Sequence, residues 1–376
     1  LVRHLKKKLE SQGIEIPAIT GEITSKQLSN ETLAALYPED KPLNLSASSL
    51  TNFYNNQYLY FVRNVLRLRE QESIHPTAFQ HGLFLHRIFE RVVMDQSELD
   101  FDQKVDKAIL RTRDEAEFAM FYNQDADARY TEEVLDRIAR SSATILRDND
   151  LVEIDGQEKS FRQDKALVFD LQNGKSVHVN GTIDRLDTLQ INQAVGVVDY
   201  KSSDQSFSVG DFYNGLKPQL VTYLAALQEL DETKNKPVFG AMYLHLQDPI
   251  IKLKDTKNLE QLEVAANTSL VYKGLFLKEE SLGLNHFYQT RNQLYTEDEF
   301  VVLLNHNQKL YKQAAMDILD GRFAINPYTK DGRSVAGEQL KAITGFEADR
   351  HMGMARRMVK EAKRQDWMER MKGGQD

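Results

Sequence analysis

Apolar residues recur along this chain of 376 residues with two different periods, and the period changes near residue 150. From residue 46 to about 149 they recur every three or four residues, which is the spacing of one face of a helix. From Leu151 onwards they alternate with polar residues, which is the spacing of a half-buried strand. We therefore expect helices, then strands, and further helices after the strands.

Serines and a proline mark where the predicted helices of this part begin. Serines 46, 48 and 49 can cap a helix that begins near Leu50. A second helix follows Pro76, and its predicted apolar stripe consists of Phe79, Leu83, Phe89 and Val93. The stretch from about 101 to 149 is charged, helical in period and free of Gly and Pro, so we expect a helical insertion there.

Asn173-Gly174 separates two alternating runs, which predicts a β-hairpin because this dipeptide favours the tight turn between antiparallel strands. The flanking runs consist of Leu167, Phe169 and Leu171 before it, and Val177, Val179 and Ile183 after it. A strand at 195–201, a helix at about 217–230 and a strand at 238–246 follow. The middle of the chain therefore reads β-β-β-α-β, with helices on both sides of it in sequence.

Both ends differ from this middle. Residues 1–45 read as a connecting segment with a helical stretch at Asn30–Leu36, and a start at Leu1 inside a helix-like run leads us to expect a piece of a longer polypeptide. Helical spacing returns at 297–319, and 352–371 is predicted to be a basic helix. That helix is either a solvated face or a patch that contacts phosphates. Its polar and aromatic residues are Arg356, Arg357, Lys360, Lys363, Arg364, Trp367 and Arg370.

Composition excludes several kinds of site. The chain has no cysteine, which rules out disulfides, thiolate zinc sites, thiol nucleophiles and cysteine-ligated iron–sulfur clusters. No apolar run approaches the roughly 20 residues of a membrane span, and there is no Gly-x-x-x-x-Gly-Lys-Ser/Thr loop. The net charge of −8 leaves room for local basic patches. We expect a cytoplasmic protein.

Two carboxylates and a lysine on neighbouring strand-like segments are the candidate chemistry. Asp184 is expected just before the turn that links its strand to the next, where the period of two places Asp199 and Lys201 on one face. Two convergent carboxylates can hold Mg²⁺, and a lysine beside the ion can orient the attacking water. The alternative is surface charge at strand ends, but apolar neighbours such as Ile183 and Val198 favour the metal site, since buried charges are rare unless paired or metal-bound.

Other polar residues keep two interpretations. Arg185 and Asp187 lie on the strand face opposite Asp184 and are expected to form an internal ion pair. His86 is either a core histidine bonded to a backbone carbonyl or a third metal ligand. Glu158 could approach the metal from an adjacent strand, but an exposed glutamate is the preferred interpretation.

Gln219 and Tyr223 are four residues apart and share a helix face, where they either pack or contact a DNA strand. Spacing alone does not decide between these interpretations.

The order and spacing of these residues resemble the RecB-type branch of the PD-(D/E)XK nucleases. The motifs of that branch are Gly-x-x-x-His, Gly-x-Ile-Asp-Arg-x-Asp, Asp-Tyr-Lys and Gln-x-x-x-Tyr. Here they are Gly82…His86, Gly181…Asp187, Asp199-Tyr200-Lys201 and Gln219…Tyr223. The resemblance spans roughly residues 45–346.

Within that branch the chain is most similar to the C-terminal nuclease domains of the AddB/RexB family. The cues are Ser46-Ala-Ser48-Ser49-Leu50 at one end and Lys341-Ala-Ile-Thr344-Gly-Phe346-Glu347 at the other. The iron–sulfur cysteines of AddB correspond here to Asn56, Val335, Glu338 and Thr344, none of which can hold a cluster. The cysteine-free form resembles RexB, and it implies that packing replaces the cluster, with Tyr58, Tyr60 and Phe346 as candidates.

The resemblance implies a restriction-endonuclease-like α/β fold, with a central mixed sheet flanked by helices, over residues 46–346 and a basic helical tail at 347–376. It also implies that Mg²⁺, or Mn²⁺ in its place, binds to His86, Asp184, Asp199 and the carbonyl of Tyr200. Lys201 would position the hydrolytic water, which makes Asp184, Asp199 and Lys201 the catalytic residues. Gln219 and Tyr223 would contact DNA.

For function, the resemblance implies an exonuclease that cuts single strands of DNA unwound by an AddA/RexA-type helicase partner, in double-strand-break repair by homologous recombination. One alternative is a catalytically silent module that guides DNA or braces the partner subunit. Another is a CRISPR-associated nuclease of the same branch, but those usually keep their cysteines and are much shorter. Because both carboxylates and the lysine are present, we favour an active nuclease.

Overall fold

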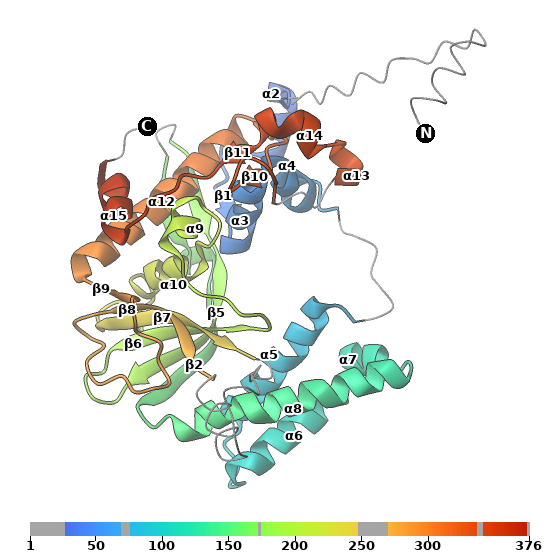
Figure 1. Ribbon diagram of the computed structural model, residues 1–376, viewed down its shortest axis with the longest axis vertical. Coiled ribbons are helices and arrows are strands. Elements are labelled where there is room, and N and C mark those ends of the chain that lie inside the picture. Colours follow the sequence, from blue (N-terminus) through green and yellow to red (C-terminus); the bar gives the residue numbers. More distant parts are fainter. Residues whose placement is uncertain (1–26, 69–75, 172–173, 247–269, 337–340, 374–376) are drawn as a thin grey trace.

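The computed structural model describes residues 27–68, 76–171, 174–246, 270–336 and 341–373. A six-stranded mixed sheet with the order β2-β5-β6-β7-β8-β9 forms its centre (Figure 1). Only the β6–β7 and β8–β9 pairs are parallel. The strands are β2 (Val152–Phe161), β5 (Gly181–Leu189), β6 (Val195–Lys201), β7 (Val238–His245), β8 (Tyr272–Leu277) and β9 (Leu294–Tyr295). This central sheet flanked by helices confirms the predicted fold class.

Helices cover both faces of the large sheet, because its strands are apolar on both sides. Adjacent residues of β6 show this division: Val197 belongs to one hydrophobic core and Val198 to the other. The first core includes α3 (Ala47–Asn55), α10 (Gln219–Leu227) and α12 (Glu297–Leu319). The second includes α5 (Ala78–Met94) and the predicted helical insertion, which consists of α6 (Phe101–Arg113), α7 (Ala116–Tyr122) and α8 (Ala126–Asp148) (Figure 1).

A separate three-stranded sheet contains the predicted hairpin. Strand β3 (Leu167–Asp170) pairs antiparallel with β4 (Ser176–Val179), and β1 (Leu43–Leu45) adds to β4 in parallel. The run that was predicted to continue from Val177 to Ile183 is instead divided between two sheets. Asn180 marks the division: its N–H donates to the Leu45 carbonyl, and the next residue begins β5 of the large sheet.

The apolar stripe predicted for the helix after Pro76 is wrong at its N-terminal end. Phe79 is 70% exposed and Leu83 is 37% exposed. These positions lie seven and three residues before His86, so they share its face and not the face that packs on the sheet. The packed face of α5 consists of Phe84, Leu85, Ile88, Phe89 and Val92.

The single basic helix predicted at 352–371 is also wrong. The chain forms a short strand, β11 (Arg356–Arg357), which pairs with β10 (Tyr328–Thr329), and only then the helix α15 (Arg364–Gly373). The reason is that Arg356 is taken up elsewhere: its guanidinium donates to the Tyr54 carbonyl and lies 5.6 Å from the centre of the Tyr54 ring. Trp367, Met368 and Met371 of α15 join the first core.

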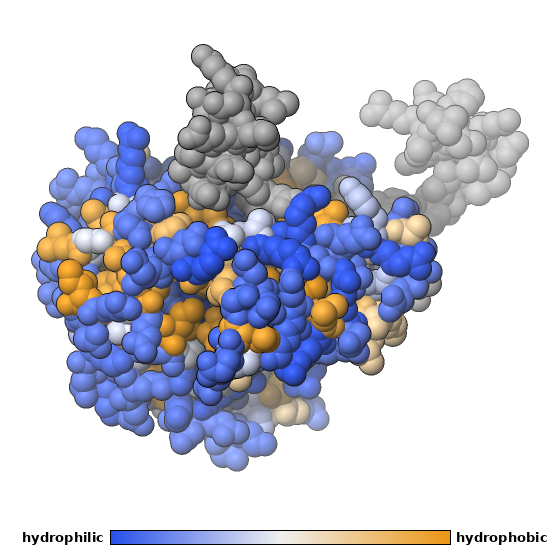
Figure 2. Space-filling model, turned by 90° about the horizontal axis from the view of Figure 1, so that it is seen from below, coloured by the Kyte–Doolittle hydropathy of each residue, from blue (hydrophilic) through white to orange (hydrophobic). Residues whose placement is uncertain are grey.

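Short elements complete the described chain. They are α2 (Asn30–Leu36), α4 (Gln57–Tyr60), a π-helix (Phe61–Val65), α9 (Val209–Tyr213), α13 (Lys341–Thr344), α14 (Ala348–His351) and 3₁₀ helices at Gln163–Lys165 and Met352–Met354. Seen from below, hydrophilic side chains cover most of the surface, and apolar ones are interspersed among them (Figure 2). Within the described ranges, no helix is both long and apolar enough to span a membrane.

The positions that correspond to cluster cysteines have other roles here. Asn56 is buried, and its Oδ1 atom accepts hydrogen bonds from the N–H groups of Tyr58 and Asn326, at 3.1 and 3.2 Å. Asn326 in turn accepts the N–H of Gln57 at 2.8 Å. We call this set of bonds the Asn56–Asn326 clasp. Val335 is partly buried, the Thr344 hydroxyl accepts the Phe346 N–H, and Glu338 lies outside the described residues.

The aromatic residues expected to replace the cluster are used in different ways. Tyr60 stacks on Phe323, which follows α12, so it does contribute to holding α4 against the later part of the chain. The ring of Tyr58 packs against Phe61 in its own segment. Phe346 is 1% exposed and contacts the ring of His351. Hydrogen bonds of the clasp therefore share the task that was assigned to packing.

Candidate metal centre and active site

The pairing of β5 with β6 ends at Arg185 and Val198, and the candidate site lies where the ladder stops. At the next step the Asp184 carboxylate replaces the backbone partner: its Oδ2 atom accepts the Tyr200 N–H at 2.9 Å. Asp184 is thus in the middle of β5, which ends only at Leu189, and its predicted place beside the turn is wrong. The charged residues that follow, Arg185 and Asp187, lie inside β5 because they form a buried ion pair. Charged residues therefore do not mark the end of this strand.

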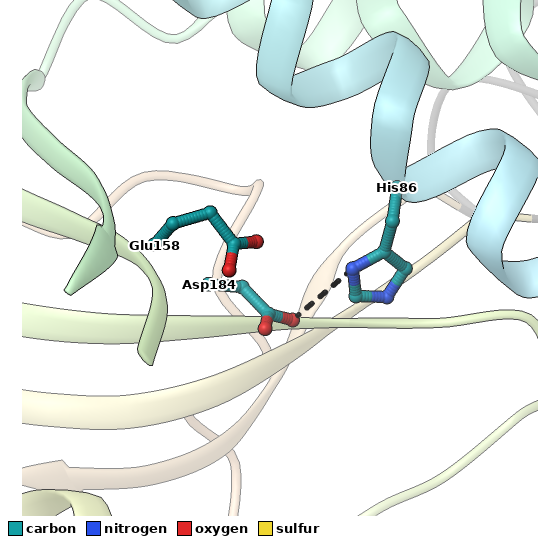
Figure 3. Close-up of side chains that lie close together, drawn as sticks. All are labelled: His86, Glu158 and Asp184. Atoms are coloured by element: carbon teal, nitrogen blue, oxygen red, sulfur yellow. Dashed lines mark ion pairs between the residues drawn. The ribbon is translucent and has the colours of Figure 1, made fainter. Parts of the chain in front are cut away.

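His86 reaches the same point from α5 (Figure 3). Its Nε2 atom lies 2.9 Å from the Tyr200 carbonyl oxygen, which can only accept, so Nε2 carries the proton. The lone pair of Nδ1 is then left on the side of Asp184, whose Oδ2 atom is 3.6 Å away. Histidines that bind metal are commonly held in this way by a hydrogen bond from the other ring nitrogen. The bond to a backbone carbonyl is therefore confirmed, and the role of His86 as a metal ligand, through the other ring nitrogen, stays a prediction.

Glu158 of β2 completes a cluster with His86 and Asp184. One potential ligand atom from each residue lies within 4.8 Å of the others. In Figure 3 the two carboxylates point towards each other and towards the imidazole. Glu158 is exposed, which agrees with the interpretation preferred in the sequence analysis, but its carboxylate also faces the site. Its backbone has a positive φ of 50°, an uncommon conformation for a residue with a side chain, and nothing in the sequence pattern indicates it.

Asp199 lies beside this cluster and is held by two neighbours. Its Oδ1 atom accepts a hydrogen bond of 2.7 Å from the Gln219 amide, and its Oδ2 atom forms an ion pair with the Lys201 ammonium. This pair confirms that Asp199 and Lys201 share a strand face. Lys201 is 22% exposed and also lies 5.6 Å from the centre of the Tyr243 ring.

Gln219 and Tyr223 are in contact with each other and with the acid. The Gln219 amide donates to the Tyr223 hydroxyl at 2.9 Å in addition to Asp199. Tyr223 is 6% exposed, and its ring packs edge-on against Phe161. The structure therefore brings these two residues to the site from α10, and their contact with DNA stays a prediction.

The pKa values of the acids at the site are raised, because these carboxylates are buried close to one another. Burial, followed by the nearby Asp199, raises the pKa of Asp184 well above its ordinary value. Burial also raises the pKa of Asp199, and the Lys201 ammonium opposes that shift. Burial raises the pKa of Glu158 and lowers the pKa of His86. A bound cation would reverse these preferences for the acids, because it favours their charged form.

The residues present fit a divalent ion. The Oδ2 atom of Asp199 is buried and, apart from its ion pair with Lys201, accepts no hydrogen bond from the described chain. Asp184 Oδ2 and His86 Nδ1 are already as close as two ligands of one ion would be. Carboxylate oxygens with an imidazole nitrogen suit Mn²⁺ and are acceptable to Mg²⁺. Residues from α5, β5 and β6 could therefore hold such an ion together.

The opposite face of the sheet carries the predicted internal ion pair. Arg185 donates twice to Asp187, at 2.7 Å each, and both side chains are fully buried. The guanidinium also donates to the hydroxyls of Tyr200 and Tyr272, at 3.3 and 2.8 Å. This satisfied network lies behind the site and fixes the ring of Tyr200, whose backbone binds Asp184 and His86.

Three of the six basic residues predicted for the C-terminal helix have partners within the fold. Arg364 donates to the Leu294 carbonyl at 2.7 Å and lies over the Tyr295 ring, and Arg370 binds Glu361 at 2.8 Å. Together with Arg356 on Tyr54, they are used to attach this segment to the body of the protein. Arg357, Lys360 and Lys363 remain exposed, so a phosphate-contacting role is a prediction for these three.

Comparisons with known proteins agree with this geometry. The sequence is 97% identical over all 376 residues to part of the B subunit of the ATP-dependent helicase/deoxyribonuclease of Streptococcus suis strain 05ZYH33, of which it covers 35%. It is 46% identical over 361 residues to the B subunits of the same name in Streptococcus mutans serotype c and Streptococcus agalactiae serotype Ia, covering 95% and 96% of this chain and 32% and 33% of those proteins. The chain therefore spans about a third of the length of these relatives.

A broader family comparison covers most of the fold just described. The sequence model of the PD-(D/E)XK nuclease superfamily matches residues 44–334, a range that contains His86, Glu158, Asp184, Asp199 and Lys201. With this match and the arrangement of its acids and lysine around one point, the chain belongs to the PD-(D/E)XK nuclease superfamily.

Proposed function

We propose that this chain hydrolyses phosphodiester bonds of single-stranded DNA with the help of Mg²⁺, as the nuclease domain of a helicase–nuclease subunit. The observation that carries the proposal is the convergence of His86, Asp184, Asp199 and Lys201 at the end of the β5–β6 ladder. The match over the full chain to proteins named as B subunits of an ATP-dependent helicase/deoxyribonuclease supports DNA as the substrate and a helicase as the partner.

In this proposal the ion is held by His86, Asp184 and Asp199. The Tyr200 carbonyl, which was also expected as a ligand, instead accepts the Nε2–H on the other side of the His86 ring and so orients that ring. A divalent ion there supplies Lewis-acid activation of water and of the scissile phosphate. The Lys201 ammonium, held beside Asp199, orients the attacking water and balances negative charge that develops on the phosphate oxygens. Gln219 keeps the Asp199 carboxylate in place and lies where it can contact the scissile strand.

The names of the same relatives support the setting that we propose for the reaction. We place the domain in a cytoplasmic complex with an AddA/RexA-type helicase subunit, which unwinds duplex and delivers single strands for exonucleolytic cleavage. Double-strand-break repair by homologous recombination is the process that uses such cleavage. Without an iron–sulfur cluster, which a cysteine-free chain cannot ligate through thiolates, the fold is held by its own side chains.

The test is cleavage of labelled single-stranded DNA by the purified chain with Mg²⁺, Mn²⁺ or a chelator. We expect metal-dependent cleavage of linear strands and little cleavage of circular ones, because an exonuclease needs an end. Asp199→Ala should abolish cleavage together with Mn²⁺ binding. Lys201→Ala should abolish cleavage but leave Mn²⁺ binding nearly intact, since every proposed ligand remains.

Melting temperatures establish that these variants are folded, and Lys236→Ala serves as a control because that partly exposed lysine pairs with Asp155 away from the site. Cleavage that survives Asp199→Ala would reject the assignment. A folded chain that binds metal but never cuts, alone or with its helicase partner, would indicate the silent, DNA-guiding alternative.

A further inference from the structure

Glu158 has an uncommon backbone conformation at a place where β2 faces the site. The ladder between β2 and β5 pairs Gln157 with Arg185 and Lys159 with Ile183, but it leaves out Glu158, which lies between them. Its φ of 50° is in the left-handed region, where a side chain is strained and glycine is favoured. Strained residues of this kind often occur at functional sites, so the side chain invites a functional explanation.

The Glu158 carboxylate also lacks a partner. Over the residues that the structure describes, it makes no hydrogen bond and no ion pair, although cations are near. Lys159, next to it, binds Glu232 at 2.8 Å. Arg87 of α5 binds Glu90 at 2.6 Å and lies 3.7 Å from Glu115. The basic groups around Glu158 are therefore already paired with other acids.

The direction of the side chain is what links it to the site. One Glu158 oxygen lies within 4.8 Å of ligand atoms on both His86 and Asp184, and Figure 3 shows the carboxylate turned towards them. Ligands of a Mg²⁺ ion, at about 2.1 Å from it, lie about 3 to 4.2 Å apart. The His86–Asp184 distance of 3.6 Å already falls in that range, and a small closing movement of Glu158 brings its oxygen into it.

We propose that Glu158 is a further ligand of the divalent ion, which it approaches from β2 on the open side of the site. This inference rests on the proposed function, because it concerns the same ion. It explains why an unpaired acid is kept in a strained conformation opposite Asp184. It also predicts that stability and metal affinity respond in opposite directions when the residue becomes glycine.

The experiment is calorimetric titration with Mn²⁺ of the whole chain and of two variants, with melting temperatures measured without metal. Glu158→Gln should weaken Mn²⁺ binding by about tenfold or more, in line with the roughly 10–100-fold effects of altering groups around metal sites. Glu158→Gly should weaken binding at least as much, while its melting temperature without metal rises because the backbone strain is relieved.

Glu153→Gln is the matched control, because Glu153 is an exposed glutamate on the same strand, opposite Thr188. It should bind Mn²⁺ like the unchanged protein, and Asp184→Asn should lose binding. If both Glu158 variants bind Mn²⁺ normally while Asp184→Asn does not, the role of Glu158 is rejected and the metal centre stands. If Asp184→Asn also binds normally, the metal centre itself is rejected, and this inference with it.

Discussion

The amide of Gln219 bridges two groups at the site, the carboxylate of Asp199 and the hydroxyl of Tyr223. Similar support holds His86, whose Nε2 atom is bound by the Tyr200 carbonyl. His86 and Asp199 are thus each oriented by a neighbouring group, the Tyr200 carbonyl and the Gln219 amide. Such supporting groups set the geometry of metal centres nearly as strictly as the ligands do.

We predict that Gln219→Ala lowers the turnover number for single-stranded DNA about 10- to 100-fold, because Asp199 loses the donor that holds it. The melting temperature should change little, since Gln219 is only partly buried. Steady-state cleavage kinetics and thermal unfolding are the measurements. Gln228→Ala, at the exposed end of the same helix, is the control.

A rise in KM for DNA without a fall in turnover would instead assign Gln219 to strand binding. A large fall in the melting temperature would point to simple packing as the role of this residue.

Residue types and the period of two were enough to predict the Asp199–Lys201 pair and the Arg185–Asp187 pair, since both depend only on which face of one strand a residue occupies. For Glu158 an approach to the metal was the less favoured of two interpretations, because the role that we propose depends on a left-handed backbone at one residue of β2. A glutamate in a strand pattern carries no signal of such a conformation.

At the scale of elements, the insertion α6–α8 packs its apolar residues on α5, the helix that carries His86. One acid in this layer is poorly accommodated. Asp136 of α8 is 7% exposed, and its Oδ1 atom has no hydrogen-bond partner among the described residues. Burial raises the pKa of Asp136 to about 6, and the ion pair with Arg113 offsets only part of that shift.

This pKa predicts a pH-dependent effect of Asp136→Asn. Below about pH 4 the Asp136 carboxyl is protonated in both states, and between about pH 4 and pH 6 only the unfolded chain gives up the proton. The stability of the unchanged protein therefore falls across this window relative to the variant. The difference should reach about 2–3 kcal/mol and stay constant above about pH 7.

Melting temperatures of both proteins from about pH 4 to about pH 8 are the measurement. Asp148→Asn, which neutralises an exposed acid at the end of the same helix, is the control for removing a carboxylate that is not buried. A difference between Asp136→Asn and the unchanged protein that does not vary with pH would contradict the explanation.

The helices themselves were largely predictable, because their apolar spacing is local. Their orientation was less so: the spacing of α5 admits Phe79 and Leu83 in its stripe, but the helix turns that side towards the site with His86. The prediction of a single helix at 352–371 was wrong for a related reason. Its local spacing is helical, whereas the contact of Arg356 with Tyr54 spans 302 positions and keeps the chain extended there.

At the scale of the whole molecule, the Asn56–Asn326 clasp ties the first helices to the segment after α12, across 270 positions of sequence. The resemblance indicated that something had to replace a cluster at Asn56, but not which residue would be the partner. The buried amide of Asn56 takes a share of the task by accepting two backbone N–H groups.

We predict that Asn56→Ala destabilises the fold by about 1–3 kcal/mol, because the Asn326 N–H is left unpaired. The Tyr58 N–H keeps a second acceptor, the Ala324 carbonyl at 3.0 Å. Asn56→Asp should lose much less, because a carboxylate can accept the same two bonds. Thermal or urea unfolding measures both variants. Equal losses in the two variants would show that the bonds to Asn56 are not what stabilises this junction.

Tyr200 contacts the candidate site with its backbone and the buried Arg185 with its side chain. Its amide and carbonyl meet Asp184 and His86, while its ring and hydroxyl rest against Arg185. Attempts to make the protein more heat-resistant by redesigning the interior around that guanidinium will move the peptide units on which the Asp184 carboxylate and the His86 imidazole depend. Tolerance to heat and the placement of two proposed ligands therefore depend on the same residue.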